Sequence, residues 1–250
     1  MTSLNNVTTL HLPIPFFFPD DEEAHDSLVY DYAMPLVADT VFVNILDVMS
    51  SKLQSLRITG AHIRNVPIRI LSSLTDLEIH ATEGSIEELM GLDVIFRHAS
   101  LLESLSLVGL FVPELFSFFS TSSEIAFPNL TSFRLSCDSD MVDLIVGEDE
   151  VGALARFLND HLLLRRLYVR LPTVSWAHVG QLLCAIPQLK RLEVLGFHTG
   201  HEALSNPAVL ESLSQCLSPQ LRALHIAINW FGGNILPLVY YFILISMIVH

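Results

Sequence analysis

Apolar and polar residues alternate in a short phrase that recurs along the chain. The phrase is leucine, two other residues, leucine or phenylalanine, one residue, and then an aliphatic residue. Alternation with a period of two is typical of a β-strand that buries one face. We therefore predict seven strands at the seven copies, which are Leu53-Leu56-Ile58, Leu74-Leu77-Ile79, Leu102-Leu105-Leu107, Leu130-Phe133-Leu135, Leu164-Leu167-Val169, Leu189-Leu192-Val194 and Leu221-Leu224-Ile226.

The spacing of these copies favours a stack of repeats. They begin 21, 28, 28, 34, 25 and 32 residues apart, within the range of about 20–50 residues that marks repeat architectures. The stretches between them have the spacing of amphipathic helices. Strand and helix in regular succession predict an α/β fold of the leucine-rich-repeat type, a ribonuclease-inhibitor-like horseshoe with parallel strands inside and helices outside. A weaker copy, Val7-Leu10-Leu12, extends the predicted domain to residues 1–230, with about seven or eight repeats.

Start and stop signals place the helices between the copies. A capping box at residues 85–88 opens one helix, and three carboxylates at residues 148–150 open another. Ser175 and Asn206 serve as caps of two more helices, each followed downstream by a proline. The predicted helices cover residues 85–99, 148–161, 175–185 and 206–217. A further helix is predicted from Asp39, with one face formed by Val41, Ile45, Val48 and Met49.

The final segment, residues 231–250, is unusually apolar. Residues 235–249 carry no charge, and Pro237 interrupts them. A membrane-spanning helix needs about 20 apolar residues, so we expect a terminal strand or helix that covers the end of the stack. A membrane anchor through residues 235–249 and a truncated or misjoined gene product are the alternatives.

Composition restricts the class of partner. Of the 250 residues, 51% are hydrophobic and 16% charged, with 13 basic and 27 acidic residues and a net charge of −14. This charge argues against nucleic acid as the main partner. The three cysteines, Cys137, Cys184 and Cys216, are predicted to be buried and reduced. Together with the lack of a recognisable secretory signal, they predict a cytoplasmic or nuclear protein, with anchoring to a membrane through the tail as the alternative.

The sequence has no specific catalytic or metal-binding motif. It contains no Gly-x-Ser-x-Gly elbow, glycine-rich phosphate loop or Cys-x-x-Cys pair. Histidines at residues 198–202 lack the spacing of zinc helices, and the aspartates at residues 138–143 lack the glycine and glutamate of a calcium loop. Both segments are interpreted as solvated loops. We predict no catalytic residue, no cofactor and no metal.

The interior face of the predicted horseshoe is the candidate binding surface. On each strand, the residues that flank the second and third apolar positions point to this side. Over seven strands this gives 21 positions, eight of which are charged: Arg57, Asp76, Glu78, Arg134, Arg166, Arg170, Arg191 and Glu193. Five are arginines in an acidic protein.

Tyr168 lies between Arg166 and Arg170, and arginine and tyrosine are residue types that anchor interfaces. We predict that an acidic or phosphorylated peptide binds around Arg134, Arg166, Tyr168 and Arg170. The alternative is that these side chains only solvate the strand face. The candidate protein-binding residues are Arg57, Glu78, Arg134, Arg166, Tyr168, Arg170, Arg191 and Glu193.

Four segments resemble the irregular leucine-rich repeats of fungal F-box proteins: LQSLRIT (53–59), LESLSLVG (102–109), FPNLTSFRL (127–135) and IPQLKRLEV (186–194). The resemblance covers about residues 4–230. It implies a non-enzymatic substrate receptor of a cullin-based ubiquitin ligase, whose F-box holds a Skp-type adaptor and whose repeats hold the substrate. No F-box segment is found before the repeats, so adaptor binding is expected only if an F-box is supplied elsewhere. A tail-anchored membrane protein that displays the repeats to the cytosol is the alternative function.

Overall fold

The computed structural model describes ten segments of the chain. They are residues 8–11, 34–49, 52–80, 91–109, 113–120, 126–137, 147–171, 176–200, 220–230 and 241–248. The predicted capping box at residues 85–88, the predicted helix at 206–217, the aspartates at 138–143 and Cys216 lie outside these segments.

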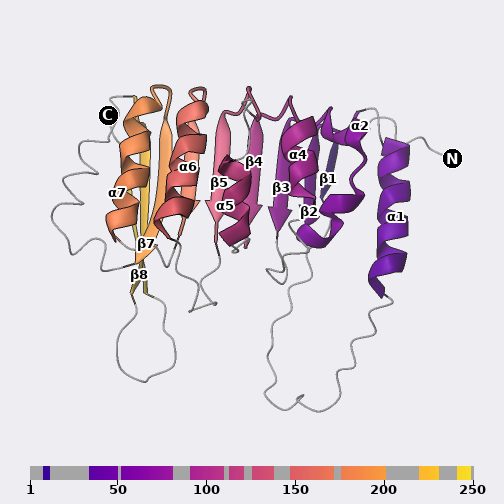
Figure 1. Cartoon of the computed structure of the whole chain (residues 1–250), viewed down its shortest axis with the longest axis horizontal. Coiled ribbons are helices and arrows are strands. Elements are labelled where there is room, and N and C mark those ends of the chain that lie inside the picture. The colour runs from indigo at the N-terminus through magenta and orange to yellow at the C-terminus, as the bar shows by residue number, and fades with distance from the viewer. Residues whose placement is uncertain are drawn as a thin grey trace, which may run out of the picture.

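The described strands form one sheet in which each strand pairs with the next along the chain (Figure 1). β1 to β8 are parallel, and β9 is antiparallel to β8. The strands are β1 Thr9–His11, β2 Ser55–Thr59, β3 Asp76–His80, β4 Ser104–Val108, β5 Ser132–Ser136, β6 Arg166–Arg170, β7 Val194–Gly200, β8 Ala223–Trp230 and β9 Tyr241–Ile248. The predicted α/β class with a parallel sheet is confirmed, and strands in chain order are compatible with a solenoid.

Helices alternate with the strands, and Figure 1 shows α4 to α7 in front of the sheet. They are α1 Met34–Met49, α2 Ile68–Leu71, α4 Leu92–His98, α5 Pro113–Ser120, α6 Glu148–Asp160 and α7 Trp176–Ala185, with 3₁₀ turns η1 Gly60–Asn65 and η2 Ile186–Gln188. The helices predicted over residues 148–161 and 175–185 are confirmed. The helix predicted to end at Ala99 ends there, with Ala99 as the C-cap of α4.

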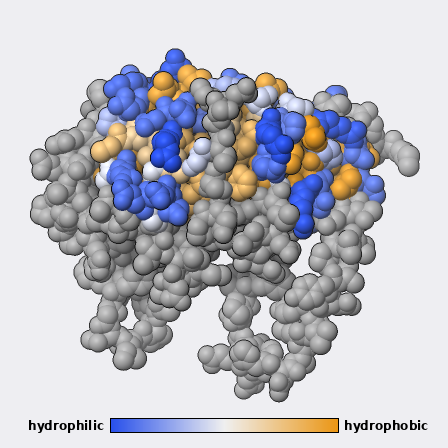
Figure 2. All heavy atoms as spheres, in the orientation of Figure 1, coloured by the Kyte–Doolittle hydropathy of each residue, from blue (hydrophilic) through white to orange (hydrophobic). Residues whose placement is uncertain are grey.

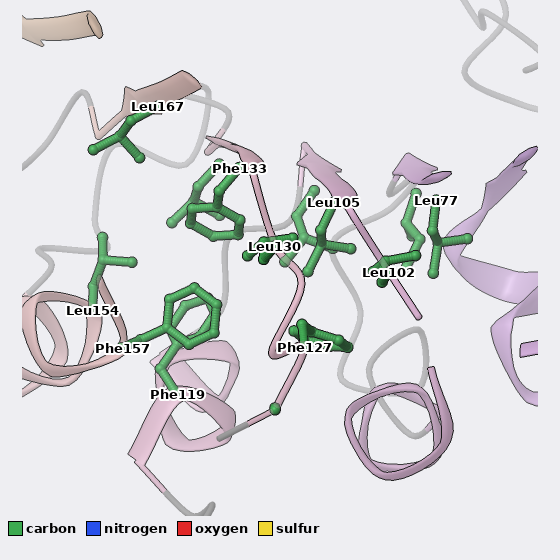
Figure 3. Close-up of a cluster of buried hydrophobic side chains, with 14 of the residues drawn as sticks. Leu77, Leu102, Leu105, Phe119, Phe127, Leu130, Phe133, Leu154, Phe157 and Leu167 are labelled. Carbon is green, nitrogen blue, oxygen red and sulfur yellow. The ribbon is translucent and has the colours of Figure 1, made fainter. Parts of the chain in front are cut away.

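The core lies between the sheet and these helices. The second motif residue of β2 to β7 is at most 1% exposed, and the residues form one continuous cluster with the helices. Figure 3 shows its centre, where Phe119, Phe133 and Phe157 meet between α5, β5 and α6. The described strands β2 to β7 therefore bury one face against the described helices.

The sixth copy of the motif lies three residues later than predicted. Leu167 pairs with Leu195 and Val169 pairs with Phe197, so the copy is Leu192-Leu195-Phe197. The prediction was wrong because Leu189, Leu192 and Leu195 are themselves three residues apart and fit the motif in two registers. Leu189 is instead buried directly after η2.

The predicted face of α1 is correct only in part, because Met49 and Ile45 pack in or against the core but Val41 and Val48 do not. Phe42, Leu46 and Met49 are buried, whereas Val41 and Val48 are 53% and 60% exposed. Both sets are apolar at helical spacing, and the set with the larger side chains removes more apolar area from water when buried. The Phe42 ring stacks on that of His62, with 4.8 Å between ring centroids.

The apolar tail supplies the last strand of the sheet. β9 pairs with β8 along its full length, from Tyr241 opposite Trp230 to Ile248 opposite Ala223. The membrane-anchor alternative requires a helix over residues 235–249, whereas residues 241–248 form a strand. In the described part of the chain, no helix is long and apolar enough to cross a membrane.

The two described cysteines differ in burial. Cys137 is buried as predicted, whereas Cys184 on α7 is exposed. Cys184 follows two buried leucines, Leu182 and Leu183, and the turn of the helix carries the next residue to its outer side.

Candidate functional site

The face of the sheet opposite the helices carries the residues that alternate with the buried ones. We call it the open face, because no described helix packs on it. The predicted residues of β2 to β6 lie on this face, and those of its middle row face one another across neighbouring strands. The middle row is Arg57, Glu78, Ser106, Arg134, Tyr168 and Gly196. Neighbouring strands lie about 4.8 Å apart, so adjacent members of the row are within side-chain reach.

The β2–β3 end of the row is an ion-pair network. The Arg57 Nε atom lies 3.4 Å from Glu78 Oε1, and the His80 ring also contacts this carboxylate. Burial and then the charge of Glu78 raise the pKa of Asp76, while His11 lowers it. The negative charge of Glu78 is thus partly compensated by Arg57 within the sheet. The sequence analysis missed the contact between Glu78 and His80, which lie two residues apart on the same face of β3.

Strands β5 and β6 carry a cluster of positively charged residues on the open face. We call Arg134, Arg166, Tyr168 and Arg170 the basic cluster. The guanidinium carbon of Arg134 lies 5.3 Å from the centroid of the Tyr168 ring, within the range of a cation–π contact. Arg134 and Arg166 are exposed, and neither forms an ion pair with a described residue. The structure therefore brings the four predicted residues together.

Gly196 on β7 makes room for the Tyr168 ring. A Cβ atom on Gly196 would lie 2.3 Å from Tyr168 Cδ2, well inside van der Waals contact. The ring therefore lies against the β7 backbone, with Arg134 on its β5 side. Sequence reasoning missed Gly196, although a glycine inside a strand often marks a close approach of this kind.

Gly196→Ala is expected to lower the free energy of unfolding by about 1 kcal/mol, because the new methyl group displaces the Tyr168 ring. In a Tyr168→Ala background the same change is expected to cost less, since its steric partner is absent. Urea unfolding of the two single variants and the double variant measures this coupling. Equal losses in both backgrounds would contradict the contact.

Two predicted site residues do not lie on the open face. Arg191 is in the turn before β7, and Glu193 directly precedes the strand. The three-residue shift of the motif places Val194, Gly196 and His198 opposite Arg166, Tyr168 and Arg170 instead. Glu193 Oε1 lies 3.9 Å from Arg165 Nη1 at the edge of the sheet.

Among the described residues, no group of three or more histidine, cysteine, aspartate or glutamate residues could hold a metal ion. Residues 198–200, predicted to lie in a loop, belong to β7.

No protein-family model matches the chain, and no curated protein sequence is significantly similar to it.

Proposed function

We propose that this chain is a non-enzymatic leucine-rich-repeat scaffold that binds another protein on the open face of its sheet. The proposal is carried by the distribution of charge on that face. From β4 to β8 the open-face positions hold Arg134, Arg166 and Arg170 and no carboxylate, although acidic residues outnumber basic ones by 27 to 13 in the whole chain. A concentration of positive charge in an acidic protein favours an anionic partner.

The residue types of the basic cluster suit an acidic or phosphorylated peptide. Guanidinium groups bind carboxylates and phosphates through paired hydrogen bonds. Tyr168 adds a rigid ring with a polar end, and its contacts with Arg134 and Gly196 restrict its position. A ring held in place before binding loses less conformational entropy when a partner docks.

The resemblance of the repeats to those of fungal F-box proteins supports a narrower role, that of a substrate receptor in a ubiquitin ligase. In that role the basic cluster would recognise the substrate. Contact with a Skp-type adaptor would require an F-box supplied elsewhere.

The test is the binding of short fluorescent peptides to the full chain, followed by anisotropy. Oligoglutamate and a phosphoserine-rich peptide are expected to bind, and added salt is expected to weaken both through screening. A neutral Gly/Ser peptide and oligolysine of equal length are the controls. Failure of both anionic peptides to bind at low salt, or equal binding of the neutral peptide, would overturn the proposal.

A further inference from the structure

A row of residues extends the parallel ladder by one rung before each strand. The backbone N–H of each member donates to the carbonyl of the previous member, with N···O distances of 2.7–2.8 Å. We call this the rim row. Its members are Gln54, Thr75, Glu103, Thr131, Arg165, Glu193 and Arg222. The hydrogen bonds fix these positions side by side at one edge of the sheet.

The charge of this edge changes along the stack. Before β2 to β5 the rim row is neutral or acidic, whereas before β6 to β8 it carries Arg165 and Arg222. Further basic side chains lie beside these two, in the turn before β7 and at the start of β6. We call the whole set the basic rim; its members, all exposed, are Arg165, Arg166, Lys190, Arg191 and Arg222.

Only one carboxylate opposes these five charges in the strands β6 to β8 and the turns described directly before them (residues 162–171, 189–200 and 220–230). It is Glu193, which lies one strand spacing from both Arg165 and Arg222. Its 3.9 Å separation from Arg165 is too long for a hydrogen bond, and the Arg165 side chain is 58% exposed. An exposed pair of this geometry contributes little. Within these described segments, Glu193 therefore compensates only a small part of the positive charge of the rim.

The basic rim adjoins the basic cluster at Arg166, which belongs to both. Together they hold seven of the chain's 13 basic residues. Along β6, Arg170 and Arg166 are about 13 Å apart at about 3.3 Å per residue. From Arg165 to Arg222 the rim adds two strand spacings, about 10 Å. The two form one track of about 23 Å, enough for about six or seven extended residues.

We propose that an anionic segment of the partner protein runs along this whole track, leaving the open face at Arg166 and crossing the rim at Arg165, Arg191 and Arg222. This inference rests on the proposed function and extends its footprint. In this inference Arg191 contacts the partner segment from the turn before β7, as part of the basic rim. The ligand chemistry is a run of carboxylates or phosphates on an extended peptide, and the glutamate and phosphoserine probes distinguish the two.

Lys190→Glu/Arg191→Glu tests the rim, because both side chains are exposed in a turn and their reversal leaves the core intact. The double variant is expected to bind a long oligoglutamate about tenfold more weakly than the wild type. A shorter oligoglutamate, which the basic cluster alone can hold, is expected to be much less affected. Glu193→Gln removes the opposing carboxylate and is expected to strengthen the binding of the long peptide about two- to threefold.

Arg156→Glu is the matched control. Arg156 is exposed on α6, on the helical side of the sheet, where Figure 2 shows hydrophilic and hydrophobic residues interspersed. Reversal of a single charge there is expected to leave both peptides bound as in the wild type. Circular dichroism and urea unfolding of each variant verify that the fold is kept.

The outcomes separate the two proposals. If no anionic peptide binds the wild-type chain, the proposed function itself fails. If Arg134→Glu weakens binding but Lys190→Glu/Arg191→Glu behaves like the Arg156→Glu control, the rim inference alone is overturned. A single-stranded oligonucleotide that binds the track more tightly than the long peptides would overturn the assignment to a protein segment.

Discussion

Phe157→Ala is expected to lower the free energy of unfolding by about 3–5 kcal/mol, the range for truncation of a buried phenylalanine. Phe157 on α6 is 3% exposed. Its ring centroid lies 4.8 Å from that of Phe119 and 5.1 Å from that of Phe133 (Figure 3). It also lies 4.1 Å from the ring centroid of His161. These neighbours lie on α5, on β5 and at the C-cap of α6, and they cannot all move inward to fill the space, so a cavity remains.

Urea unfolding of the full chain measures this loss. Phe157→Leu, which keeps most of the volume, is expected to lose much less, about 1–1.5 kcal/mol. Arg156→Ala, at the exposed neighbouring position, is expected to stay within about 0.5 kcal/mol of the wild type. A loss below about 1 kcal/mol for Phe157→Ala would show that the rings do not form a packed core.

The same aromatic region holds an unusual piece of backbone. Phe127 has a positive φ of 57° and precedes Pro128, a combination that is sterically unfavourable for a bulky residue. Its ring packs edge-on against Phe96 at 4.8 Å. The ring nitrogens of the buried His161 lie at hydrogen-bond distance from the carbonyl oxygens of Phe157 and Ala126. Core packing and these polar contacts together hold the chain in the conformation that leads into β5.

The strands could be predicted from the sequence because leucine at fixed spacing and alternation with polar residues point to the same positions. For Leu56, Leu77, Leu105, Phe133 and Leu167 the predicted register is the observed one. Before β7, Leu189 has the same three-residue spacing from Leu192 as Leu192 has from Leu195, so the motif could be placed in two registers. With the observed register the last three copies begin at Leu164, Leu192 and Leu221, 28 and 29 residues apart. Evenness of spacing was thus the signal that favoured the correct register.

The candidate site could be predicted only in part. Register alone places Arg134 beside Tyr168, since the two residues occupy equivalent motif positions on successive strands. The contact of Tyr168 with Gly196 depends on the direction of a side chain, and the basic rim depends on turn residues that belong to no strand. Arg191 was therefore assigned to the open face, whereas it lies in the turn before β7.

Arg134→Glu/Arg166→Glu is expected to weaken the binding of oligoglutamate or a phosphoserine-rich peptide about 100-fold. Each reversal replaces an attraction with a repulsion across the interface, and a loss of about 1.4 kcal/mol at each site corresponds to tenfold in affinity. Both side chains are exposed and unpaired with any described carboxylate, so we expect little change in the free energy of unfolding. Anisotropy titrations at low salt measure the affinity.

Neutral substitution separates charge from packing. Arg134→Gln/Arg166→Gln removes the attraction without adding repulsion, so its loss is expected to be intermediate, about tenfold. The salt dependence of binding is expected to decrease in the order wild type, glutamine variant, glutamate variant, because fewer charges remain to be screened. If the glutamine and glutamate variants lose affinity equally, the arginines act by shape and not by charge. If the glutamate variant binds as tightly as the wild type, the basic cluster only solvates the strands.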